Sequence, residues 1–453
     1  MPNTTKNKRI LFVGQALYNH WYLAQELCKI DWEAHVLNTD LNNSNANFYH
    51  GENFSFLREP LINPEKRLRF YFYALRHYDL FHFANSEGIV FLNQYDGIKK
   101  SKKGLLYGIT HIVLTFLFTK ILRWRLSRIY ALVYLFGTKG SHWLLKIFAH
   151  HLPERWDILL IKKINKRIVY TNNGCLDGVL RSSFNKWSTP DNNPICSTIC
   201  HYKNSEDICS DLKNKKWGEF RNNVADYQCL LGGNRVDYNI SKKIHERPEV
   251  YALDKNFWNP DLLIPTNYLL PISKDTVKLF HSVGNFDSRS KLNIQTIKST
   301  HIYFKTVEQL KEKGYNVDLI FFKDVPNKII RYYQLQADII VDMLTFGFFG
   351  ANIREGLMLG KPCICYLRPE WLEQMRSEIP GYVDELPIIN ATPSTIENIL
   401  IDLITNPAKR KDVGLKSRQF AEKWHASDVA AKKMASIYSK LILEKQQQIF
   451  NAI

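Results

Sequence analysis

The chain has 453 residues, of which 45% are hydrophobic and 23% are charged. This composition excludes an intrinsically disordered protein, and the length suits two ordinary domains rather than one. The formal net charge of +17 favours an anionic partner, either a phosphorylated small molecule or an anionic membrane surface. Nucleic acid is not expected as a partner, because no zinc-finger, helix-turn-helix or RNP motif occurs.

The first third of the chain begins with a βαβ pattern. An apolar strand is predicted over residues 9–13, followed by Gly14, a helix over 18–30 and a second strand over 34–37. This order implies a parallel sheet. Further strands are predicted at 80–83, 88–91 and 167–170. The polar, basic N-terminus does not have the pattern of a signal peptide, so we expect a cytoplasmic protein with reduced cysteines.

Two unusual segments interrupt this first series. Residues 104–156 mix large apolar residues with Arg and Lys at helical spacing, and the uncharged run is shorter than a membrane-spanning helix needs. The pattern fits a helix lying in a membrane interface or a helix pair packed on the domain's own sheet with outward cations, and both remain open. Residues 172–239 are polar, irregular and rich in Asn and Cys, which is typical of a long functional loop region.

A second βαβ series begins after Pro271. Strands are predicted at 277–281, 317–322, 338–342 and 362–366, with helices over 300–313 and 329–336 between them. Three helices then end the chain, over 395–405, 407–424 and 430–448. We therefore expect an N-terminal Rossmann-like domain over 1–260, a second over 261–430, and a helix over 431–453 that packs back on the first.

The segment from Asp342 to Pro362 has the strongest chemical signal. A buried strand ends at Asp342, and a loop with Gly347 and Gly350 precedes a helix. In a doubly wound sheet, ligands bind beyond the carboxyl ends of the strands, where the amides at helix N-termini favour phosphate. Glu355 lies one turn into the helix, where a carboxylate can accept hydrogen bonds from two ribose hydroxyls.

The string Glu355-Gly356-Leu357-Met358-Leu359-Gly360-Lys361-Pro362 resembles the nucleotide-sugar signature of retaining GT-B glycosyltransferases of family four. The resemblance implies two Rossmann-like domains facing a cleft, with Glu355 holding the donor ribose. It also implies transfer with retention and no cofactor or metal at the diphosphate. The family usually has a second glutamate eight positions earlier, where this chain has Gly347.

The same resemblance assigns a donor site to the second domain. Lys298, with Arg289 or Lys291 as its partner, would neutralise the diphosphate leaving group, because positive charge stabilises it as the glycosidic bond breaks. Solvated loop cations are the alternative for each. Glu355, Lys298 and Arg289 are the predicted catalytic residues. The remaining donor-binding residues predicted are Gly284, Asn285, Lys291, Asp342, Gly347, Phe349, Gly350, Ala351 and Asn352.

The acceptor and the transferred sugar are expected against the first domain. The residues predicted for that side are Gly14, Asn19, His82, Asn173 and Asp177. His82 ends a predicted strand and would hydrogen-bond the sugar, but a structural histidine at a strand end is at least as compatible with the pattern.

Four cysteines fall within the irregular region: Cys175, Cys196, Cys200 and Cys209. Clustered thiolates in a reduced protein could hold a structural zinc ion. Their spacing matches no zinc-ribbon or zinc-finger pattern, so free thiols are the other interpretation.

The sequence thus predicts a retaining, hexosyltransferase-like glycosyltransferase. It would move a sugar from a nucleotide-diphosphate donor to a saccharide or lipid-linked acceptor in bacterial envelope polysaccharide or glycoconjugate synthesis. The basic surface and residues 104–156 suggest a cytoplasmic protein peripheral to the inner face of the plasma membrane. The alternatives are a GT-B-type sugar-nucleotide epimerase and a non-catalytic GT-B scaffold.

Overall fold

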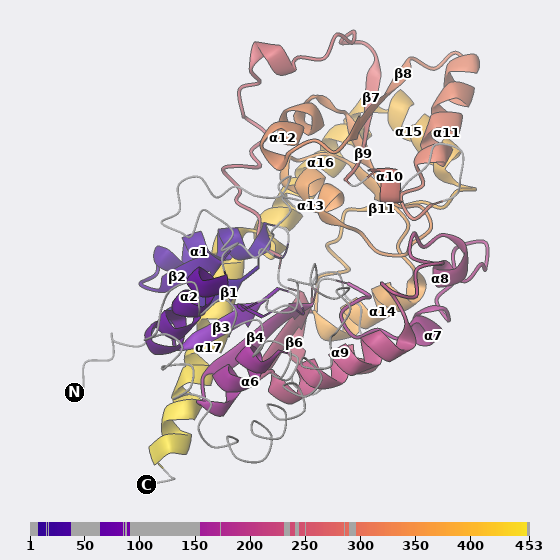
Figure 1. Cartoon of the computed structure of the whole chain (residues 1–453). Coiled ribbons are helices and arrows are strands. Elements are labelled where there is room, and N and C mark those ends of the chain that lie inside the picture. Colours follow the sequence, from indigo (N-terminus) through magenta and orange to yellow (C-terminus); the bar gives the residue numbers. More distant parts are fainter. Residues whose placement is uncertain are drawn as a thin grey trace.

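Two parallel β-sheets follow one another along the chain, each flanked by helices (Figure 1). The structure is a computed structural model. It describes residues 8–37, 64–90, 155–230, 236–240, 244–249, 251–289 and 296–450, apart from residues 15, 17, 85, 87, 173 and 285. We call the parts built around these sheets the N-terminal and C-terminal domains.

The N-terminal domain is built on six parallel strands in the order β2-β1-β3-β4-β5-β6. The strands are β1 (Arg9–Val13), β2 (Glu33–Leu37), β3 (Leu80–Phe83), β4 (Arg167–Asn172), β5 (Tyr227–Leu230) and β6 (Ile244–Glu249). Residues 10–13 of β1 and all of β3 and β4 are buried. Such continuous apolar runs are expected where helices cover both faces of a parallel sheet.

Two helices of 14 residues and several shorter ones connect these strands. They are α1 (Asn19–Cys28), α2 (Pro64–His77), α6 (Trp156–Lys163), α7 (Arg181–Phe184), α8 (Ile195–Thr198), α9 (Asp211–Val224) and the 3₁₀ helix η6 (Asp237–Ile240). Helix α9 begins where the Ser210 hydroxyl accepts a hydrogen bond from the Lys213 amide, which satisfies one of the amides left free at a helix start. The Cys-rich region therefore contains α7, α8 and α9 as ordered elements.

The C-terminal domain has five parallel strands in the order β11-β10-β9-β7-β8. The strands are β7 (Val277–Val283), β8 (Val317–Lys323), β9 (Ile339–Val341), β10 (Cys363–Cys365) and β11 (Ile389–Asn390). The 3₁₀ helix η7 (Thr266–Tyr268) precedes this sheet, and its helices are α10 (Phe286–Arg289), α11 (Thr300–Glu312), α12 (Asn327–Gln336), α13 (Ala351–Met358), α14 (Pro369–Glu378), α15 (Ile396–Thr405) and α16 (Pro407–Trp424). The strands and helices predicted for this half are confirmed to within a few residues.

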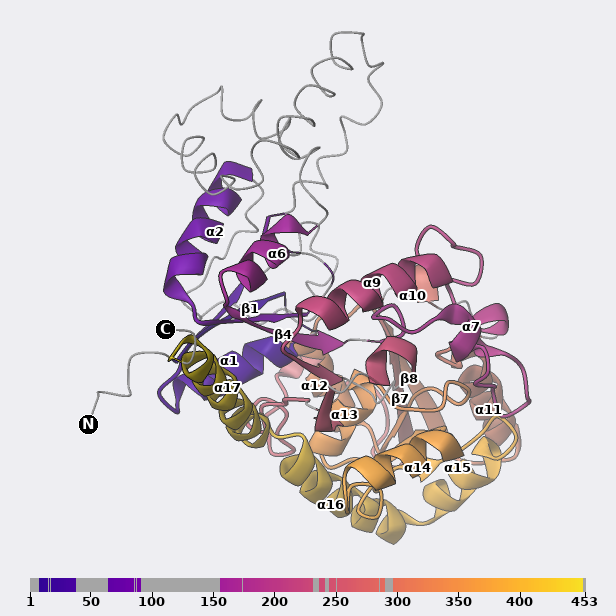
Figure 2. The same ribbon diagram turned by 90° about the horizontal axis from the view of Figure 1, so that it is seen from below.

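The last helix, α17 (Ser427–Phe450), crosses back to the N-terminal domain, as predicted. Figure 2 shows it beside α1, while α16 lies beside α13 in the C-terminal domain. The Tyr438 hydroxyl is 2.6 Å from His82 Nδ1 in β3, and Arg167 Nε in β4 donates to the Leu441 carbonyl at 2.9 Å. One cluster of buried apolar side chains accordingly continues from the first domain through α13 to α17.

The strand predicted at 88–91 is wrong over the residues that the structure describes, 88–90. The amides of Ile89 and Val90 donate to Asp157 Oδ2, at 2.6 and 2.8 Å, instead of joining a sheet. The apolar pattern correctly predicted that Ile89 and Val90 are buried. Their amides, however, are satisfied by a buried carboxylate and not by a neighbouring strand.

The segment 104–156 lies outside the described residues except for Arg155 and Trp156, so neither interpretation of it is tested. Among the helices that are described, none is long and apolar enough to span a membrane.

Candidate functional site

Two neighbouring strands of the C-terminal sheet end at the same edge, and their following loops form the donor side of the candidate site. β7 is followed by Gly284, and β9 is followed by Asp342 and the glycine loop that leads into α13. A Cβ added at Gly284 would meet no atom within 4 Å, so the backbone there borders open space. This is the position where ligands bind in doubly wound sheets.

Lys298, predicted to neutralise a diphosphate, is paired with a carboxylate at this edge. Its Nζ lies 2.9 Å from Asp342 Oδ1, and Asp342 is completely buried. The Asp342 carbonyl accepts a hydrogen bond from the Tyr303 hydroxyl, while Oδ2 has no hydrogen-bond partner among the described residues. Asp342 therefore positions the lysine head group, and the lysine still lines the cavity described below.

Glu355, predicted to hold a ribose, is only 4% exposed and accepts three hydrogen bonds from the protein. Oε1 accepts from the Tyr18 hydroxyl at 2.7 Å and from Asn327 Nδ2 at 3.1 Å, and Oε2 accepts from Gln334 Nε2 at 2.8 Å. Burial raises the pKa of Glu355 to about 7 despite these donors. One acceptor direction of the carboxylate, on Oε2, carries no hydrogen bond from the described residues.

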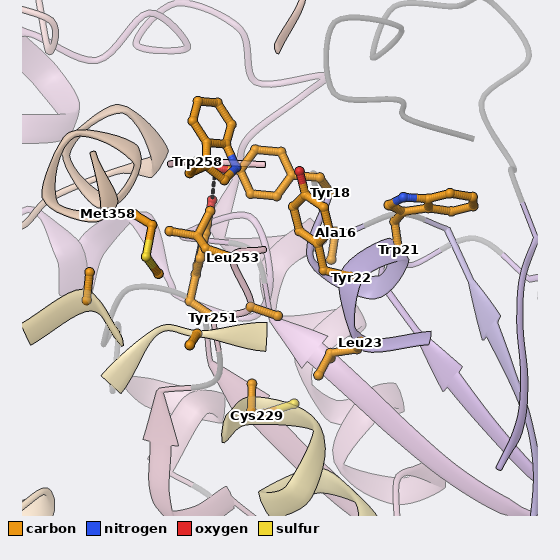
Figure 3. Close-up of a cluster of buried hydrophobic side chains, with 14 of the residues drawn as sticks. Ala16, Tyr18, Trp21, Tyr22, Leu23, Cys229, Tyr251, Leu253, Trp258 and Met358 are labelled. Carbon is orange, nitrogen blue, oxygen red and sulfur yellow. Dashed lines mark hydrogen bonds between the residues drawn. The ribbon is translucent and has the colours of Figure 1, made fainter. Parts of the chain in front are cut away.

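Tyr18 belongs to the N-terminal domain, so its hydrogen bond to Glu355 joins the two domains. Figure 3 shows Tyr18 and Tyr22 next to Trp258 and Tyr251, with Met358 of α13 nearby. The Tyr18 ring centroid is 5.9 Å from that of Tyr251 and 6.1 Å from that of Trp258. This aromatic cluster and the Tyr18–Glu355 hydrogen bond bring the segment after β1 against α13.

A cavity of about 550 Å³ lies between the Cys-rich region of the N-terminal domain and the glycine loop of the C-terminal domain. Its polar lining includes Asp177, Arg181, His201, Asn214 and Lys298, together with all four clustered cysteines. Its apolar wall from the C-terminal domain is Ile297, Met343, Phe346 and Phe348. The volume suits a small ligand held between domains.

The four cysteines lie together, as the sequence suggested, but zinc is not supported. Within the described part of the chain, no three His, Cys, Asp or Glu side chains are placed so that they could hold a metal ion. Cys200 Sγ accepts the Tyr202 amide, and Cys209 Sγ accepts from Asn214 Nδ2. Burial raises the pKa of the thiols, foremost at Cys175, so they remain protonated at neutral pH.

At Gly347, where the resembled family has a glutamate, the Arg368 side chain fills the space beside the backbone. Gly347 has φ +103°, and a Cβ there would lie 2.8 Å from Cζ of Arg368 and closer still to Nε. The Arg368 amide also donates to the Gly347 carbonyl at 2.9 Å. Glycine is therefore required at 347 both by the backbone conformation and by the arginine.

The residues predicted for the acceptor side are dispersed. His82 is fully buried, with Nδ1 bonded to Tyr438 and Nε2 2.7 Å from Thr171 Oγ1, so it is a structural histidine rather than a sugar ligand. Burial lowers its pKa well below the ordinary value. Asn19 is also buried, and its Oδ1 accepts the Ala252 amide at 2.6 Å.

Of the other acceptor-side residues that the structure describes, one lines the cavity. Gly14, with φ +81°, follows β1 and accepts a hydrogen bond at its carbonyl from His20, but it is not among the lining residues. Asp177 lines the cavity, and its Oδ1 accepts from Trp217 Nε1 at 3.2 Å. Asn173 is outside the described residues.

The other donor-side residues divide into three groups. Phe349 packs into the core, 5.6 Å from the ring of Trp371, and does not face the cavity. Gly350 is the N-cap of α13 and Ala351 its first residue, while Asn352 Oδ1 accepts from Gln334 Nε2 at 2.9 Å. The structure does not describe Asn285, Lys291 or the side chain of Arg289.

Sequence reasoning did not single out Tyr18, Gln334 or Arg368 as site residues. Tyr18 and Gln334 are far from Glu355 in sequence, and no local motif marks them. Arg368 lies in the short loop between β10 and α14, beyond the carboxyl end of an inner parallel strand. Ligands bind at that edge of such sheets, so the arginine could have been predicted as a site residue.

The comparisons with known proteins bear on the fold. No model of a known protein family matches the sequence, and no curated protein does. Sucrose-phosphate synthase from Thermosynechococcus elongatus has a similar structure, with a TM-score of 0.50 and 13% identity over 97% of this chain and 100% of that chain. Anabaena Alr3699/HepE in complex with UDP and glucose has a TM-score of 0.49 and 11% identity, over 96% of this chain and 100% of that chain. A UDP-N-acetylglucosamine 2-epimerase has a TM-score of 0.44 and 10% identity, over 95% of each chain.

At 13% identity, the likeness to the synthase shows the fold and not the activity. The predicted GT-B architecture, two Rossmann-like domains facing a cleft, is confirmed.

Proposed function

We propose that this chain is a glycosyltransferase that moves a sugar from a nucleotide-diphosphate donor to a saccharide or lipid-linked acceptor. The supporting observation is that Gly284, Lys298 and Glu355 all lie on segments that follow strands at the carboxyl edge of one parallel sheet, and that Lys298 lines a cavity closed by the other domain. A cation and a carboxylate at this edge are the two charges that a nucleoside diphosphate needs, one for the phosphates and one for the ribose hydroxyls.

In the proposed reaction, the bond between the anomeric carbon and the β-phosphate oxygen breaks, and a bond to the acceptor oxygen forms. The acceptor proton passes to the departing phosphate, so no dedicated protein base is required. Lys298 stabilises the negative charge that develops on the leaving group, and Asp342 holds its ammonium in place. By resemblance, the transfer retains the anomeric configuration.

The net charge of +17 supports an acceptor at an anionic membrane, such as a lipid-linked saccharide in bacterial envelope synthesis. Sedimentation with vesicles containing anionic lipid tests this part by itself. Binding that weakens with salt is expected, and equal recovery with neutral and anionic vesicles would rule it out.

One observation favours a second candidate, a non-catalytic GT-B scaffold. Glu355 already accepts three hydrogen bonds from protein side chains, so less of the carboxylate is free than an open ribose site would have. An epimerase has less support, because Asp177 is the one carboxylate residue lining the cavity among the residues that the structure describes.

Thermal stabilisation across UDP, GDP and their sugar derivatives, followed by a turnover assay with the stabilising donor, tests the proposal. Lys298→Met should lower the affinity for nucleoside diphosphate roughly tenfold or more, because a charge-assisted contact is lost. Lys305→Met, an exposed lysine on the following helix, is the matched control. Nucleotide binding without donor turnover would favour the scaffold, and absence of any nucleotide binding would refute the proposal.

A further inference from the structure

Arg368 is a buried cation that forms no ion pair within the described part of the chain. It is 2% exposed, and no described carboxylate lies within salt-bridge distance. Its Nη2 donates to the Phe346 carbonyl, while Nε and Nη1 have no hydrogen-bond partner among the residues that the structure describes. An unpaired buried charge is unfavourable unless something binds it, so this side chain requires an explanation.

A second buried arginine in the same protein shows what a structural role looks like. Arg221 donates through Nε to Gln228 Oε1 at 2.8 Å and through Nη2 to Asn239 Oδ1 at 2.6 Å, and Nη1 donates to the Asp177 carbonyl. All three of its nitrogens are used. Arg368 uses one, so its surroundings are not those of a side chain that only supports the fold.

The position of Arg368 connects it with the candidate site. Its Cζ lies 4.0 Å from the ring centroid of Trp187 and 5.8 Å from that of Phe184, both in the N-terminal domain. Phe184 and Phe346, which both contact the guanidinium, also line the cavity between the domains. The guanidinium therefore lies directly behind the cavity wall, and the stacking on Trp187 offsets part of its desolvation.

The glycine at 347 and the arginine at 368 form one arrangement. The Arg368 guanidinium fills the space that a side chain at position 347, a glutamate in the resembled family, would enter, so the arginine in this position requires glycine there. This part of the site therefore carries a positive charge, from Arg368, where the resembled family carries the negative charge of a glutamate. A cation there selects an acidic sugar, whereas a carboxylate selects sugar hydroxyls.

Resting on the proposed function, we propose that Arg368 binds a carboxylate on the donor sugar, so that the donor is a nucleotide-diphosphate uronic acid. The donor is favoured over the acceptor as the source of the carboxylate because Arg368 is bonded to Phe346 and Gly347, in the donor-side glycine loop. Arg368 is a specificity-determining residue in this assignment, and a guanidinium is the side chain best suited to a carboxylate.

The test compares UDP-glucuronic acid with UDP-glucose, and GDP-mannuronic acid with GDP-mannose, by calorimetric affinity on the full chain. The acid should bind more tightly than its neutral partner by roughly tenfold or more, as a charge-assisted hydrogen bond requires. Arg368→Met should abolish this preference and leave the affinity for the free nucleoside diphosphate unchanged, which also shows that the variant is folded. Arg368→Lys should keep part of the preference, and Arg376→Met, at an exposed position on α14, the helix that Arg368 precedes, should keep all of it.

Each other outcome has a definite meaning. If nucleotides bind but acid and neutral sugars bind equally, or if Arg368→Met does not change the preference, this assignment is overturned and the proposed function stands. If free glucuronic acid binds in an Arg368-dependent manner while the nucleotide sugars show no preference, the carboxylate belongs to the acceptor and the donor assignment is overturned. If no nucleotide binds at all, the proposed function fails and this inference fails with it.

Discussion

Replacing Glu355 by Gln should change how the stability of the protein depends on pH. The pKa of Glu355 is raised from 4.5 to about 7, chiefly by burial. Between these two values the folded state binds a proton that the unfolded state has released, so the free energy of unfolding falls as pH rises through that interval. Each pH unit corresponds to about 1.4 kcal/mol, which makes the full effect about 3 kcal/mol above pH 7.

Glutamine is close in shape to glutamate and does not ionise, so the variant lacks this pH-dependent loss. Its Oε1 can still accept from Tyr18 and Asn327, and the Gln334 amide can rotate to accept from the new amide group. The difference in unfolding free energy, variant minus wild type, should therefore rise by about 2 to 3 kcal/mol between pH 5 and pH 8.

Urea unfolding at a series of pH values measures this difference directly. Glu373→Gln, at an exposed position of α14, is the control and should follow the wild-type profile throughout. Parallel profiles for Glu355→Gln and the wild type would refute the reasoning, because they would mean that Glu355 titrates equally in the folded and unfolded chains.

Three further substitutions test other contacts by urea unfolding. Tyr18→Phe removes the donor to Glu355 and should lower the unfolding free energy by about 1 to 3 kcal/mol at pH 8; an unchanged value would mean that the domains do not depend on this bond. Gly347→Ala should lower it by about 2 to 4 kcal/mol, because φ is positive and the methyl group overlaps Arg368. Combining it with Arg368→Met should recover part of that loss, whereas strict additivity would contradict the overlap. Asp157→Asn has one side-chain oxygen where the carboxylate has two, so a backbone amide loses its acceptor, and the unfolding free energy should fall by about 1 to 3 kcal/mol. A wild-type value would mean that these amides do not depend on the carboxylate.

The fold and the donor loop were predictable because their signals are local. The strand before Asp342, the two glycines and the helix containing Glu355 are read from about twenty consecutive residues, and the structure places them as expected. The helix predicted at 329–336 begins at Asn327, a small difference that follows from Pro326 setting the helix start.

The partners of these residues were not predictable, because they come from distant parts of the chain. Tyr18 donates to Glu355 across 337 positions, and no pattern within one element encodes that contact. His82 looked like a ligand at a strand end, yet Tyr438 of the last helix covers it. The strand predicted at 88–91 had the right hydrophobicity, but its neighbour in space is the Asp157 carboxylate rather than another strand.

The crossing of α17 has a consequence for how the protein is made. The β3 and β4 strands of the first sheet are hydrogen-bonded to Tyr438 and Leu441, which a ribosome adds after every strand of both sheets. The N-terminal domain therefore cannot reach its final packing before α17 has been synthesised, although domains usually fold in the order in which they emerge. The C-terminal sheet, whose strands β7 to β11 all precede α17 in sequence, can form first. We expect the half that is translated first to finish folding last.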